Sequence, residues 1–274
     1  MAKTMVVIPT YNEKENLEYL VRSILILHPD FFMTIVDDNS PDGTGELADN
    51  LAEFSPTMHV IHRPKKGGLG SAYVVGFRYA LSTETDYIIE MDADLSHDPA
   101  SLNDLVEAIE QYDLVVGSRY LNGVRVEGWP FRRLLLSKFA NIYAAHVMVI
   151  PVWDCTSGFR CYRREVLEHI DLTRIRSDGY AFQIEMLYYA YTHGFHIKEV
   201  PIMFRERMHG YSKISRHVVW EAFWLVLRCH APFWKIVRHL RYLFHDYNEF
   251  VQHHPVTQKK PEQKENVHPP AQDY

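Results

Sequence analysis

The stretch YIIEMDADLSHD, residues 87–98, joins a short apolar run to three aspartates and a histidine. Residues 87–92 have the continuous apolar pattern of a strand that is buried on both faces. Asp92 and Asp94 follow at the end of this strand, where a turn of the backbone lets both carboxylates reach one ion. Divalent cations such as Mg²⁺ prefer oxygen ligands of this kind. The alternative is a solvated loop in which Asp98 stabilises the start of the next helix.

Similar apolar runs surround this stretch, and segments with helical spacing separate them. Further strands are predicted at residues 4–9, 32–38, 58–62 and 113–118. Helices are predicted after Asn12, which forms a capping-box pattern with Glu15, and at residues 44–54, 69–81 and 99–109. Strands that alternate with helices form a parallel sheet with helices on both faces. Ligands bind outside the carboxyl ends of such strands, and this chain has polar clusters there, at residues 10–13, 37–42, 92–97 and 117–120.

The regular alternation ends near residue 130. Beyond it the pattern predicts a long helix from about residue 134, strands at 158–163 and 196–207, and a helix at 181–193. We expect a single, mostly parallel α/β domain over residues 1–215. Residues 216–250 are rich in Trp and Arg and are predicted as C-terminal amphipathic helices, which either lie on an anionic membrane surface or pack on the core. Residues 251–274 are polar with four prolines and are predicted to be a disordered tail.

Composition excludes several classes of protein. The net charge is −6 over 274 residues, so no basic excess points to nucleic acid. The three cysteines fit neither a disulfide framework nor a zinc site, which favours a reducing cytosol. The start of the chain does not have the pattern of a signal peptide, and no apolar run reaches the ~18 residues of a membrane span.

Two loops after predicted strands have their own chemistry. Asp38 follows the second strand and could accept hydrogen bonds from a nucleoside, although the Asn-Ser-Pro-Asp-Gly that follows is also a turn signal. Gly67, Gly68 and Gly70 follow the third strand. They fail as a dinucleotide fingerprint because Tyr73 stands where the third glycine should be, which argues against a dehydrogenase.

Basic residues that could grip phosphate are scattered through the second half of the chain. They are Arg119, Arg132, Arg133, Arg207 and Lys213. Arginine binds phosphate oxygens through its planar fork of donors. For any one of these residues, a solvated surface charge is the simpler interpretation. The loop in which Arg207 and Lys213 flank Gly210 is harder to explain in that way.

Taken in order, the motifs resemble one known family. They are VIPTYNE (7–13), VDDNS (36–40), GLGSA (68–72), MDADLSH (91–97), GSRY (117–120), DCTSGFR (154–160) and RMHGYSK (207–213). This set resembles glycosyltransferase family 2, and within it the polyprenol (dolichol) phosphate mannosyltransferases. The resemblance covers about residues 4–215. It implies a GT-A fold, which is Rossmann-like with a mostly parallel sheet, and transfer of a hexose from a nucleotide sugar to a lipid phosphate with inversion.

The resemblance also implies roles for individual residues. Pro9, Tyr11, Glu13 and Asp38 would bind the nucleoside, and Asp92 and Asp94 would bind Mg²⁺ or Mn²⁺ on the diphosphate. Ser96 stands where some relatives have a glutamine as a further metal ligand, so its contact is the weakest of the set. Phosphates of donor or acceptor would be held by Arg119, Arg133, Ser137, Arg207 and Lys213. The residues expected to act in catalysis are Asp94, Arg119, Arg207 and Lys213.

The expected activity is that of a polyprenyl-phosphate β-mannosyltransferase. The partners would be GDP-mannose, a polyprenyl phosphate lipid and a membrane surface, with the protein peripheral on the cytoplasmic face. One alternative is a sister enzyme that transfers glucose from UDP-glucose to the same lipid. Another is a protein that binds nucleotide sugars without turnover.

Overall fold

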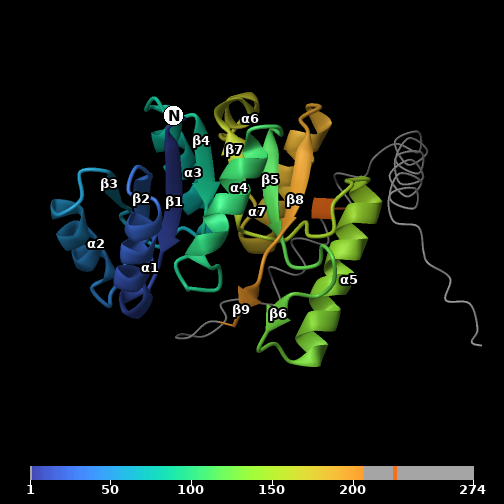
Figure 1. Ribbon diagram of the computed structural model, residues 1–274, viewed down its shortest axis with the longest axis horizontal. Coiled ribbons are helices and arrows are strands. Elements are labelled where there is room, and N and C mark those ends of the chain that lie inside the picture. Colours follow the sequence, from blue (N-terminus) through green and yellow to red (C-terminus); the bar gives the residue numbers. More distant parts are fainter. Residues whose placement is uncertain (1, 207–224, 227–274) are drawn as a thin grey trace, which may run out of the picture. The chain divides into compact units, whose positions relative to one another are not determined.

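The computed structural model describes residues 2–206, 225 and 226. Within these residues, seven strands form one sheet in the order β3-β2-β1-β4-β7-β5-β8 (Figure 1). The strands are β1 (Thr4–Thr10), β2 (Phe32–Asp37), β3 (Met58–His62), β4 (Tyr87–Glu90), β5 (Leu114–Ser118), β7 (Arg160–Arg163) and β8 (Ile197–Pro201). All neighbouring pairs are parallel except those of β7, which runs antiparallel between β4 and β5. The predicted α/β class with a mostly parallel sheet is confirmed.

Helices cover both faces of this sheet. The helices of residues 2–206 are α1 (Lys14–Leu27), α2 (Thr44–Glu53), α3 (Leu69–Leu81), the 3₁₀ turn η1 (Pro99–Ser101), α4 (Leu102–Ile109), α5 (Phe131–Met148), α6 (Arg164–His169) and α7 (Gly179–Thr192), of which α5 stands beside the β8 edge of the sheet (Figure 1). Alternate residues of β1 point to opposite faces, as strand geometry requires. Val6 packs in the core shared with α1 and α4, whereas Val7 packs in the core shared with α3 and α7.

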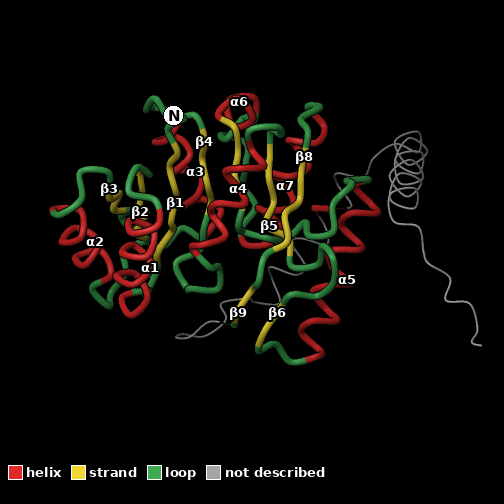
Figure 2. Tube along the Cα trace, viewed as in Figure 1, coloured by secondary structure: helices red, strands yellow, loops and turns green. Residues whose placement is uncertain are grey.

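The predicted strand at 196–207 is interrupted. β8 ends at Pro201, which pairs with Ser118, the last residue of β5, so the main sheet offers no partner beyond this point. The chain then pairs elsewhere: β9 (Phe204–Arg205) runs parallel to β6 (Val126–Glu127) in a second, two-stranded sheet (Figure 2). This small sheet lies at the carboxyl end of β5 and β8, and it carries side chains toward the site described below.

The predicted helix cap at Asn12 is wrong. Asn12 is in the left-handed region with φ 56°, the helix α1 begins at Lys14, and the backbone N–H of Lys14 donates to Asp42 Oδ2 at 3.3 Å. The backbone N–H of Asn12 donates instead to Ser40 Oγ at 3.0 Å, and that of Glu13 donates to Thr44 Oγ1 at 3.0 Å. These bonds join the loop after β1 to the loop after β2.

Most of the predicted C-terminal region lies outside the described residues. This applies to the proposed tail at 251–274 and to the helices at 216–250, apart from Leu225 and Val226. Val226 is buried in the core cluster formed by α3 and α7, and Leu225 packs against the same cluster. At these two positions the chain therefore contacts the core of the α/β domain.

Candidate active site

A cleft of about 630 Å³ opens at the carboxyl ends of β1, β2, β4 and β5. Eight of the predicted site residues line it: Pro9, Tyr11, Glu13, Asp38, Asp92, Asp94, Arg119 and Arg133. Ser96 and Ser137 lie nearby without lining it, and Arg207 and Lys213 lie outside the described residues. The fold thus gathers side chains from four strand ends and from α5 into one cavity, as expected for a parallel sheet.

The carboxylate pair is held in a tight turn directly after β4. Asp94 is almost fully buried at 3% exposure, and its Oδ1 accepts a hydrogen bond from the backbone N–H of Ser96 at 3.1 Å. Leu95 between them has φ 60°, a conformation that costs a non-glycine residue roughly 1 kcal/mol or more. The Asp92 carboxylate accepts a hydrogen bond from Tyr73 Oη at 2.9 Å. Local strain and hydrogen bonds together fix both carboxylates at the cleft.

The donor set suits a divalent cation that a substrate completes. Across the described residues, no group of three His, Cys, Asp or Glu side chains is arranged to hold a metal ion. Asp92 and Asp94 could supply two oxygen ligands, and Mg²⁺ typically takes one or two carboxylates from protein when phosphates and water provide the rest. Ser96 is 1% exposed, and its Oγ has no hydrogen-bond partner within the described part of the chain. Its place among the metal ligands stays a prediction.

Asp38 organises one wall of the cleft. Its Oδ2 accepts hydrogen bonds from the backbone N–H groups of Gly67 at 2.9 Å and Gly68 at 3.1 Å, and its carboxylate is paired with Arg63. The predicted nucleoside ligand is thus also the anchor of the glycine-rich loop. Gly68 has φ 98°, and a Cβ there would lie 2.6 Å from Asp178 Oδ2, so only glycine fits.

The same wall of the cleft also carries Lys66. The Lys66 ammonium lies 3.8 Å from the centre of the Tyr11 ring, over its face, and both residues line the cleft. The ring and the lysine come from the loops after β1 and β3, on either side of β2. This arrangement is a cation–π contact that places an aromatic ring and a positive charge together at the cleft.

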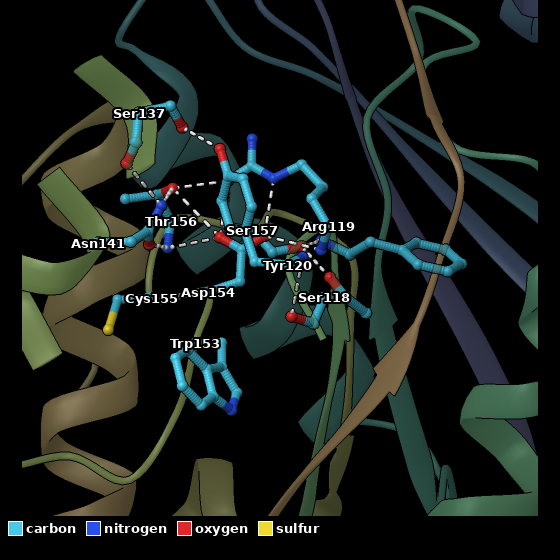
Figure 3. Close-up of polar contacts among 12 residues, drawn as sticks. Ser118, Arg119, Tyr120, Ser137, Asn141, Trp153, Asp154, Cys155, Thr156 and Ser157 are labelled. Carbon is cyan, nitrogen blue, oxygen red and sulfur yellow. Dashed lines mark hydrogen bonds and ion pairs between the residues drawn. The ribbon is translucent and has the colours of Figure 1, made fainter. Parts of the chain in front are cut away.

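Arg119 and Asp154 form a buried, two-pronged ion pair at the site (Figure 3). Arg119 Nε and Nη2 donate to the two Asp154 carboxylate oxygens at 2.7 and 2.6 Å, and Nη2 also donates to Thr156 Oγ1 at 2.6 Å. Burial alone would raise the pKa of Asp154, but the charge and hydrogen bonds of Arg119 hold it below its ordinary value. Arg119 is therefore a fixed positive charge at the wall of the cleft, and its orientation is set by Asp154.

A second buried carboxylate, that of Glu199, holds the backbone that carries Asp154. Glu199 of β8 accepts hydrogen bonds from two successive backbone N–H groups, those of Trp153 at 2.8 Å and Asp154 at 2.9 Å. Burial raises the pKa of Glu199 to about 7, against the effect of the two backbone donors. These contacts account for three polar residues of the DCTSGFR motif. Asp154 and Thr156 hold Arg119, while the buried Arg160 donates to the backbone carbonyls of Cys155 and Gln183.

Arg133 and Ser137 lie one turn apart on α5. The guanidinium of Arg133 lies 4.1 Å from the centre of the Trp129 ring, and its Nη1 donates to Glu206 Oε1 at 3.0 Å. Ser137 Oγ accepts a hydrogen bond from Tyr120 Oη at 2.7 Å (Figure 3). Arg133 thus reaches the cleft together with Arg119, whereas Ser137 is tied to the tyrosine that follows Arg119.

Several lining residues were not among the predicted site residues. They are His97, Trp129, Arg176, Asp178, Tyr180, Gln183 and Phe204. The ring of His97 stacks on Phe159 at 4.9 Å and meets Phe204 edge-on at 5.4 Å. His97 is part of the motif at 91–97, which could have suggested it. Trp129 and Phe204 come from the segments around β6 and β9, whose pairing cannot be read from local sequence.

The fold and this cleft define the class of protein. The chain belongs to glycosyl transferase family 2, whose family model matches residues 5–171. A polyprenol monophosphomannose synthase of Mycolicibacterium smegmatis is 48% identical over 226 residues, which are 82% of this chain and 85% of the relative. An undecaprenyl-phosphate mannosyltransferase of Micrococcus luteus is 43% identical over 220 residues, which are 80% and 90% of the two chains.

Solved structures show the same fold at lower identity. Glucosyl-3-phosphoglycerate synthase from Mycobacterium tuberculosis, in complex with Mn²⁺, UDP and glucosyl-3-phosphoglycerate, superposes with a TM-score of 0.62 and 20% identity. The match covers 84% of this chain and 80% of that chain. The domain is therefore a GT-A domain. No helix among the described residues is both long and apolar enough to cross a membrane.

Proposed function

We propose that this chain transfers mannose from GDP-mannose to a polyprenyl phosphate, with inversion at the anomeric carbon and with Mg²⁺ or Mn²⁺ as cofactor. The choice of sugar and acceptor rests on the two mannosyl-transferring relatives, which cover at least 80% of this chain. The observation that carries the proposal is one cleft lined by a carboxylate pair, Asp92 and Asp94, and by two arginines, Arg119 and Arg133. The reaction needs both groups: the carboxylates for a metal-bound diphosphate and the arginines for an acceptor phosphate.

In the proposed reaction the two carboxylates and the two arginines have distinct tasks. A divalent cation bound by Asp92 and Asp94 would neutralise the charge that develops on the departing diphosphate. Arg119 and Arg133 would hold the acceptor phosphate on the opposite face of the sugar. The bond from C1 of mannose to the diphosphate oxygen breaks, and GDP leaves with the electron pair. A bond from C1 to an oxygen of the lipid phosphate forms in line with it.

The acceptor needs little activation. The second pKa of a phosphate monoester is about 6, so the lipid phosphate arrives as an anion at neutral pH. We therefore propose that no side chain acts as a strong general base and that orientation supplies much of the rate. The network behind Arg119 fits this role, because Asp154 and Glu199 fix the arginine before the substrate binds. In the same proposal Arg207 and Lys213, outside the described residues, hold further phosphate oxygens.

We further propose that the protein acts as a peripheral protein on the cytoplasmic face of a membrane. The support is the surface of α5, the helix that carries Arg133 toward the cleft. It exposes five large apolar side chains: Phe131, Leu135, Leu136, Phe139 and Ile142. Arg132 and Lys138, on the same helix, are exposed as well. Apolar side chains with basic neighbours next to a phosphate site suit contact with an anionic lipid surface.

A transfer assay tests the activity. Purified full-length protein would be incubated with a short polyprenyl phosphate, Mn²⁺ or Mg²⁺, and labelled GDP-mannose or UDP-glucose in parallel. We expect label in the organic phase from GDP-mannose only, and loss of transfer when EDTA is added. Transfer from UDP-glucose alone would replace the proposal with the glucosyl enzyme. Tight nucleotide binding without transfer from either donor would contradict the proposed activity.

A further inference from the structure

Tyr73 connects the hydrophobic core to the candidate metal site. It lies on α3, is fully buried at 0% exposure, and its Oη donates to Asp92 Oδ1 at 2.9 Å. Its ring stacks on Phe182 with 5.7 Å between centroids and 5° between planes, and on Phe77 at 5.8 Å. Since these rings belong to the packed core, the hydroxyl is held in one position.

A phenylalanine would pack equally well against those rings, so packing alone does not account for the hydroxyl. The hydroxyl is the donor of the hydrogen bond to Asp92, and the carboxylate oxygen is the acceptor. A buried hydroxyl that reaches a cleft carboxylate can set the rotamer of that carboxylate.

Gly158 lies near Asp92 and leaves room beside its carboxylate. A Cβ at position 158 would lie 3.6 Å from Asp92 Oδ2 and 3.7 Å from Asp92 Oδ1. These are ordinary van der Waals distances, so the Tyr73 hydroxyl, rather than Gly158, restrains the carboxylate.

We propose that Tyr73 is a positioning residue for the divalent cation: its hydroxyl pre-orients Asp92 so that the carboxylate binds the ion without rearrangement. This inference rests on the metal use in the proposed function. Hydrogen-bonding partners of metal ligands typically change metal affinity by about 10–100-fold. Tyr73 itself makes no contact with the ion in this proposal.

Mn²⁺ titration of the full-length protein tests the inference. Free Mn²⁺ would be measured by electron paramagnetic resonance in the presence of GDP, without acceptor. In Tyr73→Phe we expect the Kd for Mn²⁺ to rise about tenfold, with the GDP affinity measured without metal unchanged. The matched control is Tyr162→Phe. Tyr162 is also fully buried, and its hydroxyl donates to Glu90 Oε1 at 3.4 Å rather than to Asp92. Its Kd for Mn²⁺ should match that of the wild type.

A double-mutant cycle separates positioning from a general structural effect. In the Asp92→Asn background, Tyr73→Phe should not weaken Mn²⁺ binding further, because the carboxylate that it orients is gone. Thermal unfolding of each variant would verify that the fold is retained. An unchanged Kd in Tyr73→Phe, an equal loss in Tyr162→Phe, or no Mn²⁺ binding by the wild type would each overturn the inference. Wild-type binding of Mn²⁺ without sugar transfer would refute the proposed function alone.

Discussion

Arg119 and Asp154, 35 positions apart in the sequence, form a two-pronged ion pair with 3% and 0% exposure of their side chains. Such a pair depends on both partners, because removing one leaves a buried charge without compensation. In Asp154→Asn we expect a loss of about 3–5 kcal/mol in the free energy of unfolding, measured by urea denaturation. The control is Asp171→Asn, which removes an ion pair whose Arg174 and Asp171 side chains are 80% and 52% exposed. That change should have little effect, because solvent screens an exposed pair, and equal losses in the two variants would contradict the buried pair.

Asp94→Ala should abolish transfer while the domain stays folded. Asp94 supplies one of the two carboxylates at the cleft, and loss of such electrostatic stabilisation lowers kcat by roughly 10²–10³-fold. The measurement is label transfer at saturating donor, with thermal unfolding of the variant as the check on folding. Asp104→Ala, on the first turn of α4, is a comparison outside the lining of the cleft. Transfer by Asp94→Ala that still responds to added metal would remove Asp94 from the metal site.

The raised pKa of Glu199 predicts that the folded protein becomes less stable as the pH rises. Its ordinary pKa is 4.5, whereas burial raises it to about 7 in the folded protein. The folded state therefore holds this proton more tightly than the unfolded state does. The stabilisation is complete below pH 4.5 and is lost as the pH rises to and through 7. Glu90, whose pKa burial raises to about 8, acts in the same direction.

We therefore expect the free energy of unfolding to fall between pH 5 and pH 8 and to fall less steeply in Glu199→Gln. Urea denaturation at several pH values would measure both slopes. Glu168→Gln serves as the control, because Glu168 is partner to Arg164 in an exposed helix pair. If Glu199→Gln has the same slope of unfolding free energy against pH as the wild type, the Glu199 carboxyl does not titrate between pH 5 and pH 8.

The apolar surface of α5 predicts binding to anionic vesicles. Phe131, Leu135 and Phe139 are 75%, 58% and 66% exposed and recur every four residues along the helix. Their combined replacement by serine should lower the vesicle partition coefficient at least about tenfold, since each fully buried apolar side chain contributes about 1.5–3 kcal/mol. Co-sedimentation with vesicles that contain phosphatidylserine would measure this.

The matched control for this experiment replaces two exposed apolar residues elsewhere. Ile26 on α1 and Phe54 after α2 are 80% and 87% exposed, so Ile26→Ser and Phe54→Ser remove comparable apolar surface. These variants should bind vesicles like the wild type. Equal losses at both surfaces, or none at α5, would exclude α5 as the lipid contact.

The sequence predicts those parts of the fold that local patterns determine, and it misses those that depend on contacts between distant segments. The strands before residue 120 and the carboxylate pair at 92 and 94 are local patterns, and the structure has them where the patterns place them. The cap at Asn12 failed because Asp42, far along the chain, accepts from the first N–H of α1, while Ser40 and Thr44 bond the backbone of Asn12 and Glu13. The strand at 196–207 broke because β5 ends at Ser118, which periodicity within the strand does not reveal.

The same contrast between local and distant interactions holds for the candidate site. Cleft residues within motifs, such as Tyr11, Asp38 and Arg119, were predictable from the loops that follow strands. The hydrogen-bond partners of such residues could not be predicted in this way. Asp38 bonds to Gly67 from another loop, and Tyr73, read only as a missing glycine, bonds to Asp92 from the core of α3. Hydrogen bonds between distant segments depend on the completed packing of the sheet.

The antiparallel strand β7 also sets the order in which the nascent chain can complete its fold. β3, β2, β1 and β4 are contiguous in the sheet, so they can assemble once residue 90 has left the ribosome. β5 cannot join them, because both β4 and β5 pair with β7 rather than with each other. At about 5–20 residues per second, residues 119–163 take roughly 2–9 seconds to synthesise. During that interval the edge of β4 has no partner strand, and a chain that stops after β5 lacks the strand that would unite its two halves.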